Sequence, residues 1–283
     1  MAARPEDPRE SYLLLRARLV RELGRFLAPA EAAQEARMWL ELGLGMPRHE
    51  LARRGTEVVP AAHLRRVRGG MRRREQGEPF LQMLGWAPFC GRRFRITPEV
   101  MIPRSHSEAA ARAALAWGRE LGVRACVDVG TGCGNLAVTL ALESSWRLAA
   151  TELSPAALRV ARANARALGA RVAFAQGSLL EPLREPLDFV VANLPYEDPS
   201  RACGIADALA FEPPVALVSP GSGTDLNARL LEQAWGKGAR ACLLEHGPGQ
   251  GAALAEAARK AGWPELRVAQ DSLGEDHLLY VWR

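Results

Sequence analysis

From residue 124 to the end of the chain, short apolar segments alternate with helical ones, and this alternation constrains the fold more than any other feature. Helical patterns cover residues 135–142, 155–168, 227–235 and 251–261. The strand-like segments are ACVDVG, RLAATEL, RVAFAQG, LDFVVANLP, ARACLLEHG, ELRVAQDS and HLLYVWR. Strands that are apolar throughout and connected by helices are typical of a parallel sheet covered on both faces. The sequence therefore predicts a doubly wound α/β domain of seven strands, with the last pair antiparallel.

The first 85 residues carry a different pattern, in which apolar residues recur every three or four positions. The segments YLLLRARLVRELGRFL and AEAAQEARMWLELGLG show this spacing, which is typical of amphipathic helices. Pro29, Pro47, Gly55 and Pro60 interrupt it. No strand-like segment occurs there, so we expect a small all-α domain of four or five short helices.

The segment GWAPFCGRRFRITPEVMIPRSHSE joins the two patterns. Its apolar residues around Phe89 and Phe94 predict a short hairpin, and Pro98 and Pro103 bracket an extended segment. A helix is expected at 107–121. The predicted organisation is a helical domain at 1–85, a hairpin linker at 86–106 and an α/β domain at 107–283.

The positive charge of the chain is concentrated in its first third. Residues 1–85 hold 16 arginines and no lysine against 11 acidic residues, a difference of +5, which equals the formal charge of the whole chain. The densest run is RRVRGGMRRRE. Such a run can attract RNA or an acidic protein, and it can equally be a solvated helix face.

Several classes of protein are disfavoured by composition. The five cysteines are dispersed without a CxxC pair, and the five histidines have no ligand spacing, so neither a disulfide framework nor a metal site is predicted. No run approaches the roughly 18 consecutive apolar residues that a membrane span needs. We expect a cytoplasmic protein without a membrane anchor.

A glycine-rich loop follows the first predicted strand of the α/β domain. In VDVGTGCGN, Gly130, Gly132 and Gly134 let the backbone turn sharply and present its amides at a helix N-terminus. Such loops also bind dinucleotides, and Ala137 is a permitted substitution in that fingerprint. The loop alone therefore leaves the cofactor open.

Two further strand ends complete the predicted cofactor site. Glu152 lies 22 residues after Gly130, where its carboxylate can accept both ribose hydroxyl protons; alternatively, it caps the following helix. Ser178 follows the third strand, where the edge of an adenine is expected. The residues predicted to bind the cofactor are Asp128, Gly130, Thr131, Gly132, Gly134, Glu152, Leu153, Ser178, Leu179 and Asn193.

The fourth strand ends in Asn193, Leu194, Pro195 and Tyr196, which identifies the chemistry better than the loop does. A nicotinamide enzyme would need an acid, a base or a hydride site here. The four residues instead suit a planar NH2 group: the Asn193 side chain and the Leu194 carbonyl accept its two N–H groups. Pro195 keeps the preceding residue extended, and Tyr196 offers a ring face. This favours methylation by S-adenosylmethionine over a chance strand end in which asparagine caps a helix.

Seven motifs together resemble the HemK/PrmC family, whose members methylate a glutamine of peptide chain release factors. They are GEPF, FCGRRFRITPEVMIPR, DVGTGCG, ELSPAALRVARANA, NLPY, FEPPVAL and LLEHGPGQG. The resemblance implies a class I, Rossmann-like methyltransferase domain that uses S-adenosyl-L-methionine and receives a GGQ-type glutamine at Asn193–Tyr196. It also implies that the helical domain and the hairpin dock the protein substrate, with Arg104 and Glu212 among the substrate-binding residues.

The sequence departs from the family pattern at three places. Leu194 stands where the usual motif NPPY has proline, and only its carbonyl is needed for the predicted hydrogen bond. The usual IPRPETE is here IPRSHSE, and Ser178 replaces an acid that would bind the adenine amine. A serine after the arginine also occurs in methyltransferases of a large-subunit ribosomal protein.

Alternatives therefore stay open beside a release factor as substrate. The chain could be a paralogue that acts on a ribosomal protein, an adenine amino-group methyltransferase of RNA or DNA, or a degenerate cofactor-binding protein. Arg104 would either bind the carboxylate of the cofactor or anchor the linker, and Glu212 would either lie beside the site or cap the following turn. His246 is expected to be a loop histidine without a catalytic role, and the protein a monomer.

Overall fold

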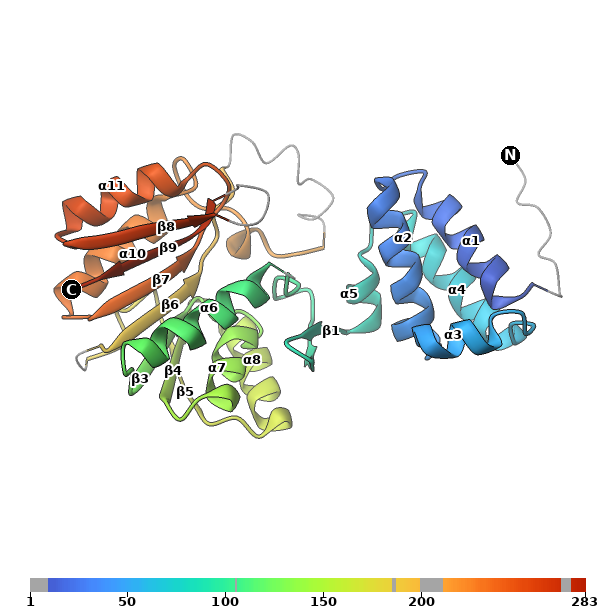
Figure 1. Cartoon of the computed structure of the whole chain (residues 1–283), viewed down its shortest axis with the longest axis horizontal. Helices are drawn as coiled ribbons and strands as arrows, with labels where there is room; N and C mark the ends of the chain where they lie inside the picture. Colours follow the sequence, from blue (N-terminus) through green and yellow to red (C-terminus); the bar gives the residue numbers. More distant parts are fainter. Residues whose placement is uncertain (1–9, 105, 185–186, 199–210, 271–275) are drawn as a thin grey trace. The chain divides into compact units, whose positions relative to one another are not determined.

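The structure is a computed structural model that describes residues 10–104, 106–184, 187–198, 211–270 and 276–283. The chain divides into two compact units, Met1–Leu84 and Gly85–Arg283 (Figure 1). Each unit packs around its own core of buried hydrophobic residues. No helix in the described ranges is both long and apolar enough to cross a membrane.

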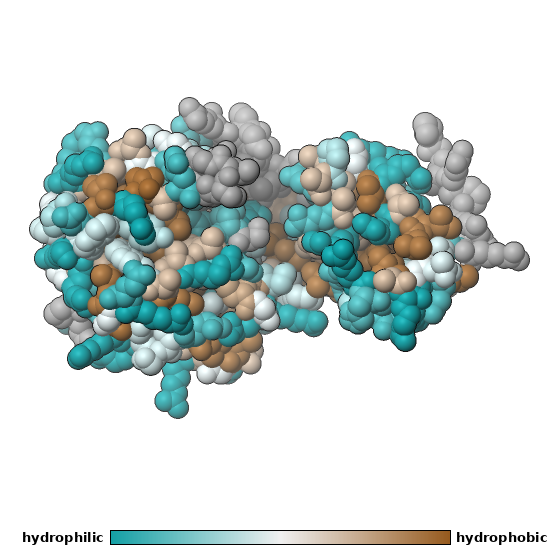
Figure 2. Space-filling view, viewed as in Figure 1, coloured by the Kyte–Doolittle hydropathy of each residue, from teal (hydrophilic) through white to brown (hydrophobic). Residues whose placement is uncertain are grey.

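The first unit is all-helical, as the sequence predicts. Its prolines mark helix starts: Pro29 is the first residue of α2, and Pro47 and Pro60 immediately precede α3 and α4. The helices are α1 (Tyr12–Leu23), α2 (Pro29–Met38), which the π-helical η1 (Trp39–Gly43) follows directly, α3 (Arg48–Arg54), α4 (Ala61–Arg74) and α5 (Phe80–Leu84). Hydrophilic residues cover much of the face of this unit shown in Figure 2.

A close approach of two helices explains a glycine inside α4. The Trp39 ring packs against Phe80, with ring centroids 4.6 Å apart, and lies directly over Gly70. A Cβ at position 70 would come within 2.0 Å of that ring. The glycine therefore lets α4 reach the aromatic core despite its poor helix propensity.

The second unit begins with the predicted hairpin, β1 (Trp86–Phe89) and β2 (Arg92–Arg95). Its two-residue turn places Cys90 and Gly91 at φ +46° and +73°, as a turn that matches the twist of the strands requires. The Cys90 N–H donates to Glu108 at 2.8 Å, and the Asn164 side chain bonds both backbone groups of Arg95. The hairpin is thus fixed to the α/β unit by hydrogen bonds.

A seven-stranded sheet forms the centre of this unit, in the order β5-β4-β3-β6-β7-β9-β8. The first five of these strands are parallel, and β9 is antiparallel to both β7 and β8, as predicted for the last pair. The strands are β3 (Ala125–Val129), β4 (Arg147–Glu152), β5 (Val172–Gln176), β6 (Phe189–Asn193), β7 (Ala241–Glu245), β8 (Glu265–Gln270) and β9 (Asp276–Trp282).

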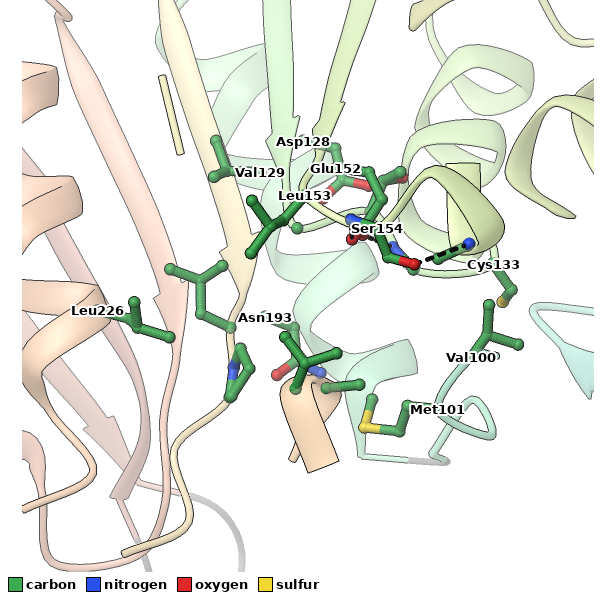
Figure 3. Close-up of a pocket in the computed structure, with 18 of the residues that line it drawn as sticks. Val100, Met101, Asp128, Val129, Cys133, Glu152, Leu153, Ser154, Asn193 and Leu226 are labelled. Atoms are coloured by element: carbon green, nitrogen blue, oxygen red, sulfur yellow. Dashed lines mark hydrogen bonds between the residues drawn. The ribbon is translucent and has the colours of Figure 1, made fainter. Parts of the chain in front are cut away.

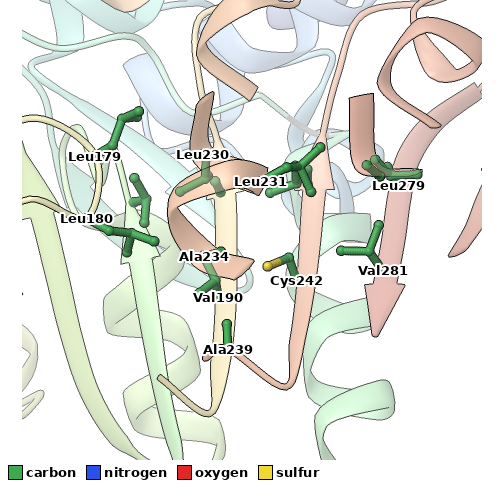
Figure 4. Packing of buried hydrophobic residues seen from close by; sticks show 14 of the residues in the cluster. Leu179, Leu180, Val190, Leu230, Leu231, Ala234, Ala239, Cys242, Leu279 and Val281 are labelled. Atoms are coloured by element: carbon green, nitrogen blue, oxygen red, sulfur yellow. The ribbon is translucent and has the colours of Figure 1, made fainter. Parts of the chain in front are cut away.

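Helices cover both faces of the sheet. On one face, Trp117 of α6 packs edge-on against Phe189 and Tyr280, with ring centroids 5.5 and 5.0 Å away. On the other, Leu230, Leu231 and Ala234 of α10 lie over Val190 and Cys242 (Figure 4). The helices of the unit are α6 (Ser107–Glu120), α7 (Asn135–Glu143), α8 (Pro155–Leu168), α10 (Asp225–Gly236), α11 (Gly251–Ala261) and the 3-10 turn η3 (Pro214–Ala216).

Candidate active site

A cavity of about 320 Å³ opens at the carboxyl ends of β3, β4, β5 and β6 (Figure 3). This is the edge of a parallel sheet at which open α/β folds bind ligands. Gly134, although predicted to bind the cofactor, does not line it: a Cβ there would lie 3.2 Å from Ala161, so this glycine lets α7 pack against α8. The predicted cofactor residues that do line the cavity are Asp128, Gly130, Thr131, Gly132, Glu152, Leu153, Ser178, Leu179 and Asn193.

Asp128 holds the glycine-rich loop in place from below. Its Oδ2 accepts hydrogen bonds from the Thr131 hydroxyl at 2.6 Å and from the Ala137 amide at 3.0 Å, which ties the end of β3 to the start of α7. The carboxyl is fully buried, and burial raises the pKa of Asp128 to about 6. Asp128 therefore shapes the loop through hydrogen bonds.

Glu152, the last residue of β4, has both carboxylate oxygens bonded to backbone amides of the cavity. Its Oε2 accepts the Gly132 amide at 2.9 Å and its Oε1 accepts the Ser154 amide at 2.8 Å (Figure 3). Each carboxylate oxygen has a further lone pair for a hydroxyl donor. Ser154, rather than Glu152, caps α8, because its hydroxyl accepts the Ala157 amide at 3.2 Å.

Apolar side chains and a strained turn line the rest of the cavity. Leu153 and Val215 line it and are more than half exposed, as two faces for a flat ring would be. Leu179 has φ +45°, in the left-handed region that few non-glycine residues occupy. The Leu180 amide donates to the Gln233 side chain at 2.9 Å and so helps to hold this turn. A carboxylate, a glycine loop and apolar faces together fit the ribose and adenine of S-adenosylmethionine.

The asparagine that ends β6 is held on one side only. The Asn193 Nδ2 donates to the Ser107 hydroxyl at 2.9 Å, and that hydroxyl donates to Glu245 at 3.0 Å. Over the part of the chain that the structure describes, no hydrogen bond is donated to the Asn193 Oδ1 or to the Leu194 carbonyl. These are the two oxygens that the sequence predicts as acceptors.

Residues after β7 hold the next part of the motif. The Gln250 side chain donates to the Tyr196 carbonyl at 2.8 Å and accepts the Gly247 amide at 2.9 Å. A Cβ at Gly247 would lie 3.1 Å from the Tyr196 ring, so the glycine makes room for the phenol. Burial raises the pKa of Tyr196 to about 12. The motif LLEHGPGQG thus fixes Tyr196 while the phenol stays neutral.

A second cavity, of about 70 Å³, adjoins the first. Its lining includes all four residues Asn193–Tyr196 together with Arg104 and Glu197. The two cavities share Met101, Asn193, Leu194, Pro195 and Ala216 as walls. A large cavity and one of side-chain size therefore share Asn193 and Leu194 in their lining.

Arg104 and Glu212 pair with each other. Glu212 is 3% exposed; it accepts the Arg104 guanidinium at 2.7 Å and the Ile102 amide at 2.8 Å. Of the two roles predicted for Arg104, this contact corresponds to anchoring the linker, and the residue lines only the smaller cavity. Glu212 itself lines neither cavity. It fixes the linker segment whose residues Met101 and Arg104 line the smaller one.

Sequence reasoning missed four polar residues around the site: Ser107, Asn164, Glu245 and Gln250. The signal for Glu245 was present, because a charged residue ends a strand that is otherwise apolar. His246, expected as a loop histidine, is fully buried, and its Nδ1 contacts the Gly247 carbonyl at 2.9 Å. Within the described segments, no cluster of three or more metal-ligating side chains occurs.

Comparison with known proteins shows what this chain is similar to. Residues 18–85 match the PrmC N-terminal domain family, and residues 118–223 match the methyltransferase small domain family. The chain is 37% identical over 252 residues to the release factor glutamine methyltransferase of Bordetella pertussis, covering 86% of this chain and 92% of that one. It is 38% identical over 251 residues to the enzyme of the same name from Neisseria gonorrhoeae, covering 86% and 91%.

Solved structures resemble the second unit in fold. The catalytic domain of human hMettl16, in complex with MAT2A 3'UTR hairpin 6, superposes with a TM-score of 0.54 at 18% identity, over 67% of this chain and 74% of that one. A methyltransferase from Pyrococcus furiosus gives a TM-score of 0.51 at 15% identity, over 67% and 87%. At these identities the likeness establishes the class I methyltransferase fold alone.

Proposed function

This chain belongs to the family of release factor glutamine methyltransferases, and we propose that it methylates the side-chain amide of a GGQ-type glutamine in a peptide chain release factor. One observation carries the proposal from family to site. Asn193 and Leu194 line both cavities, and neither the Asn193 side-chain oxygen nor the Leu194 carbonyl accepts a hydrogen bond from the described residues.

The proposed reaction asks the chain for positioning rather than for proton transfer. An amide nitrogen is a poor nucleophile because its lone pair is delocalised into the carbonyl. Two acceptors that bind its two N–H groups localise electron density on the nitrogen and direct it towards the larger cavity. Placement of reacting atoms within about 3–3.5 Å can supply several kcal/mol of the barrier.

The chain's residues divide the remaining work between them. When bound, S-adenosyl-L-methionine would supply an electrophilic methyl group to the acceptor nitrogen, with S-adenosylhomocysteine as the leaving group. Glu152 and the glycine-rich loop bind the adenosyl end, and the Tyr196 ring stacks on the acceptor amide. The Tyr196 phenol is no base, because its pKa is about 12, so the proton of the methylated nitrogen passes to water.

The direct test incubates the full chain with methyl-labelled S-adenosyl-L-methionine and a purified release factor. We expect label on the release factor and none on a matched factor whose target glutamine is replaced by alanine. Asn193→Ala should lower turnover by at least about 100-fold while the Kd of S-adenosylhomocysteine changes little, because the proposed contact of the carboxamide oxygen is to the acceptor amide, whereas Glu152 and the glycine-rich loop hold the adenosyl end. Equal loss of cofactor binding would contradict the role given to Asn193.

Pools of RNA and of ribosomal proteins complete the same experiment. Label in RNA alone would replace the proposal by adenine methylation, and label in a ribosomal protein alone would identify a paralogue with another target. Absence of label in every pool would favour a protein that binds the cofactor without turnover.

Other properties belong to the proposal as predictions. Because a release factor works on the ribosome, we place the enzyme in the cytoplasm. We expect a monomer, which sedimentation at several concentrations measures. Contact of the arginine-rich α4 with RNA stays a prediction, and a steep loss of RNA binding with rising salt would be its signature.

A further inference from the structure

A chain of three side chains connects the acceptor asparagine to a buried carboxylate. Asn193 and Glu245 are register partners at the ends of the neighbouring parallel strands β6 and β7. Ser107, the first residue of α6, lies between their side chains, 2.9 Å from the Asn193 Nδ2 and 3.0 Å from the Glu245 Oε1. Ser107 and Glu245 are 4% and 2% exposed, so water does not compete freely for these bonds.

The chemistry of the three groups fixes the direction of both hydrogen bonds. The Ser107 hydroxyl donates to the Glu245 Oε1, so its single proton points away from Asn193. The Ser107 oxygen can then act only as an acceptor towards Asn193. It must face the NH2 group of the carboxamide, and the Asn193 oxygen faces the opposite way. A flipped carboxamide would set its oxygen against the serine oxygen with no proton between them.

We propose that Ser107 and Glu245 are positioning residues for the methyl transfer, which they serve by keeping the Asn193 oxygen turned towards the acceptor nitrogen. This inference rests on the proposed function, in which that oxygen receives an N–H of the substrate amide. A free carboxamide presents its oxygen and its NH2 group with similar ease. The NH2 orientation would repel the substrate N–H groups, so the serine and the glutamate select the productive rotamer before the substrate binds.

The environment of Glu245 suits this role. The His106 Nε2 lies 3.2 Å from the same Oε1 that receives the serine proton. The Asn227 side chain donates to the Glu245 backbone carbonyl at 3.3 Å, so the residue is held at its main chain as well. The carboxylate thus stays in place with one oxygen committed to Ser107.

Two substitutions at position 107 separate the effect of the hydroxyl group from the effect of side-chain volume. Ser107→Thr keeps the hydroxyl, and Ser107→Val introduces a side chain of nearly the same volume as threonine but without the hydroxyl. We expect turnover of Ser107→Val to fall by roughly 10- to 100-fold relative to Ser107→Thr, within the range for a misplaced catalytic contact. The Kd of S-adenosylhomocysteine should stay within about threefold, because Glu152 and the glycine-rich loop hold the adenosyl end. KM for the release factor should change less than turnover, because its docking contacts away from Asn193 are kept. Equal turnover of the two variants would overturn the proposal.

Glu245→Gln tests the other end of the chain. A carboxamide at 245 can donate to Ser107, and the freed serine proton can then bond to the oxygen of a flipped Asn193 carboxamide. We expect a loss of turnover like that of Ser107→Val with an unchanged melting temperature. Full turnover in a folded Glu245→Gln enzyme would contradict the proposal.

A measurement without substrate distinguishes failure of this inference from failure of the proposed function. The side-chain NH2 resonances of Asn193 in 15N-labelled protein are assigned by their disappearance in Asn193→Ala. With S-adenosylhomocysteine bound, we expect these resonances to shift in Ser107→Val and not in Ser107→Thr. Unshifted resonances in Ser107→Val overturn the positioning role even if no release factor is methylated, and a shift supports it in either case.

Discussion

At the scale of single residues, the partly buried phenol of Tyr196 shows how the site can use an ionisable group without ionising it. Burial raises its pKa to about 12, so the hydroxyl keeps its proton throughout the neutral range. Tyr196→Phe should therefore keep turnover within about threefold, whereas Tyr196→Ala, which removes the ring, should lower it by at least roughly 30-fold. Steady-state kinetics with the release factor distinguish the two. A large loss in Tyr196→Phe would mean that the hydroxyl itself contacts the substrate.

Asp128 gives a second prediction at this scale, in the pH dependence of stability. Its pKa is about 6 in the folded chain against a reference of 3.8. Between these values the unfolded carboxyl has lost its proton and the folded one keeps it, so the folded state binds more protons. The unfolding free energy contributed by Asp128 is then fully present below about pH 4 and falls as the pH rises through 6, by up to roughly 3 kcal/mol.

Urea unfolding of the native chain and of Asp128→Asn at pH 4, 5, 6 and 7 measures this effect. The variant cannot titrate at position 128, so the difference in unfolding free energy between the two proteins isolates the carboxyl. We expect the unfolding free energy of the native chain to fall relative to that of Asp128→Asn as the pH rises. A difference that is independent of pH would show that the carboxylate is already ionised at pH 4, despite its burial.

At the scale of elements, Asn164 of α8 connects the hairpin to the glycine-rich loop. Its Oδ1 accepts the Arg95 amide at 2.8 Å, and its Nδ2 donates to the carbonyls of Arg95 and Cys133 at 2.9 and 2.8 Å. The residue is 3% exposed, so removal of the carboxamide leaves backbone groups without partners in a dry site. We expect Asn164→Ala to lower the unfolding free energy by about 2–4 kcal/mol.

The same substitution should also weaken cofactor binding, because the Cys133 carbonyl belongs to the loop that lines the cavity. Isothermal titration with S-adenosylhomocysteine measures this, and a several-fold rise in Kd is expected. Asn164→Asp is the control that keeps the accepted hydrogen bond and loses both donated ones. If it binds the cofactor as tightly as the native chain, the loop does not depend on Asn164.

Elements were predictable from the sequence where local pattern and tertiary packing agree. The helices α8 and α11 occupy the predicted ranges because each has local signals at its ends. Ser154 caps the start of α8, the loop after β7 precedes α11, and a glycine in the left-handed region follows each helix. The π-helical stretch at Trp39–Gly43 and the left-handed Leu179 were not predicted, since neither has a local signal. The link from Ser107 to Glu245 spans 138 residues and exists only because two parallel strands end side by side under α6.

At the scale of the whole molecule, the two units have separate cores and separate charge. The first core holds residues from Tyr12 to Phe80 and the second residues from Val127 to Val281. Every residue that lines the two cavities of the candidate site lies in the second unit, whereas the excess positive charge lies in residues 1–85. We therefore expect a division of labour, with chemistry in the second unit and electrostatic attraction of the partner in the first.

Removal of the first unit tests this division. A truncated chain, Gly85–Arg283, keeps the sheet, the hairpin and the whole cofactor cavity. Its Kd for S-adenosylhomocysteine should therefore stay within about threefold of the Kd of the full chain. Its kcat/KM for an intact release factor should fall by at least roughly 100-fold, because docking contacts and attraction are lost together. A short glutamine peptide, which lacks the rest of the release factor, is the matched substrate that both chains should methylate alike.

Salt separates the two parts of that loss. If arginines of the first unit attract an acidic face of the partner, kcat/KM of the full chain falls with ionic strength, since charges more than about 8 Å apart are screened at physiological salt. The truncated chain has equal numbers of basic and acidic residues from residue 86 onward, so its kcat/KM should hardly change with ionic strength. If kcat/KM falls equally with salt in the two chains, the attraction belongs to the α/β unit. If the truncated chain is as active as the full chain, the first unit does not dock the substrate.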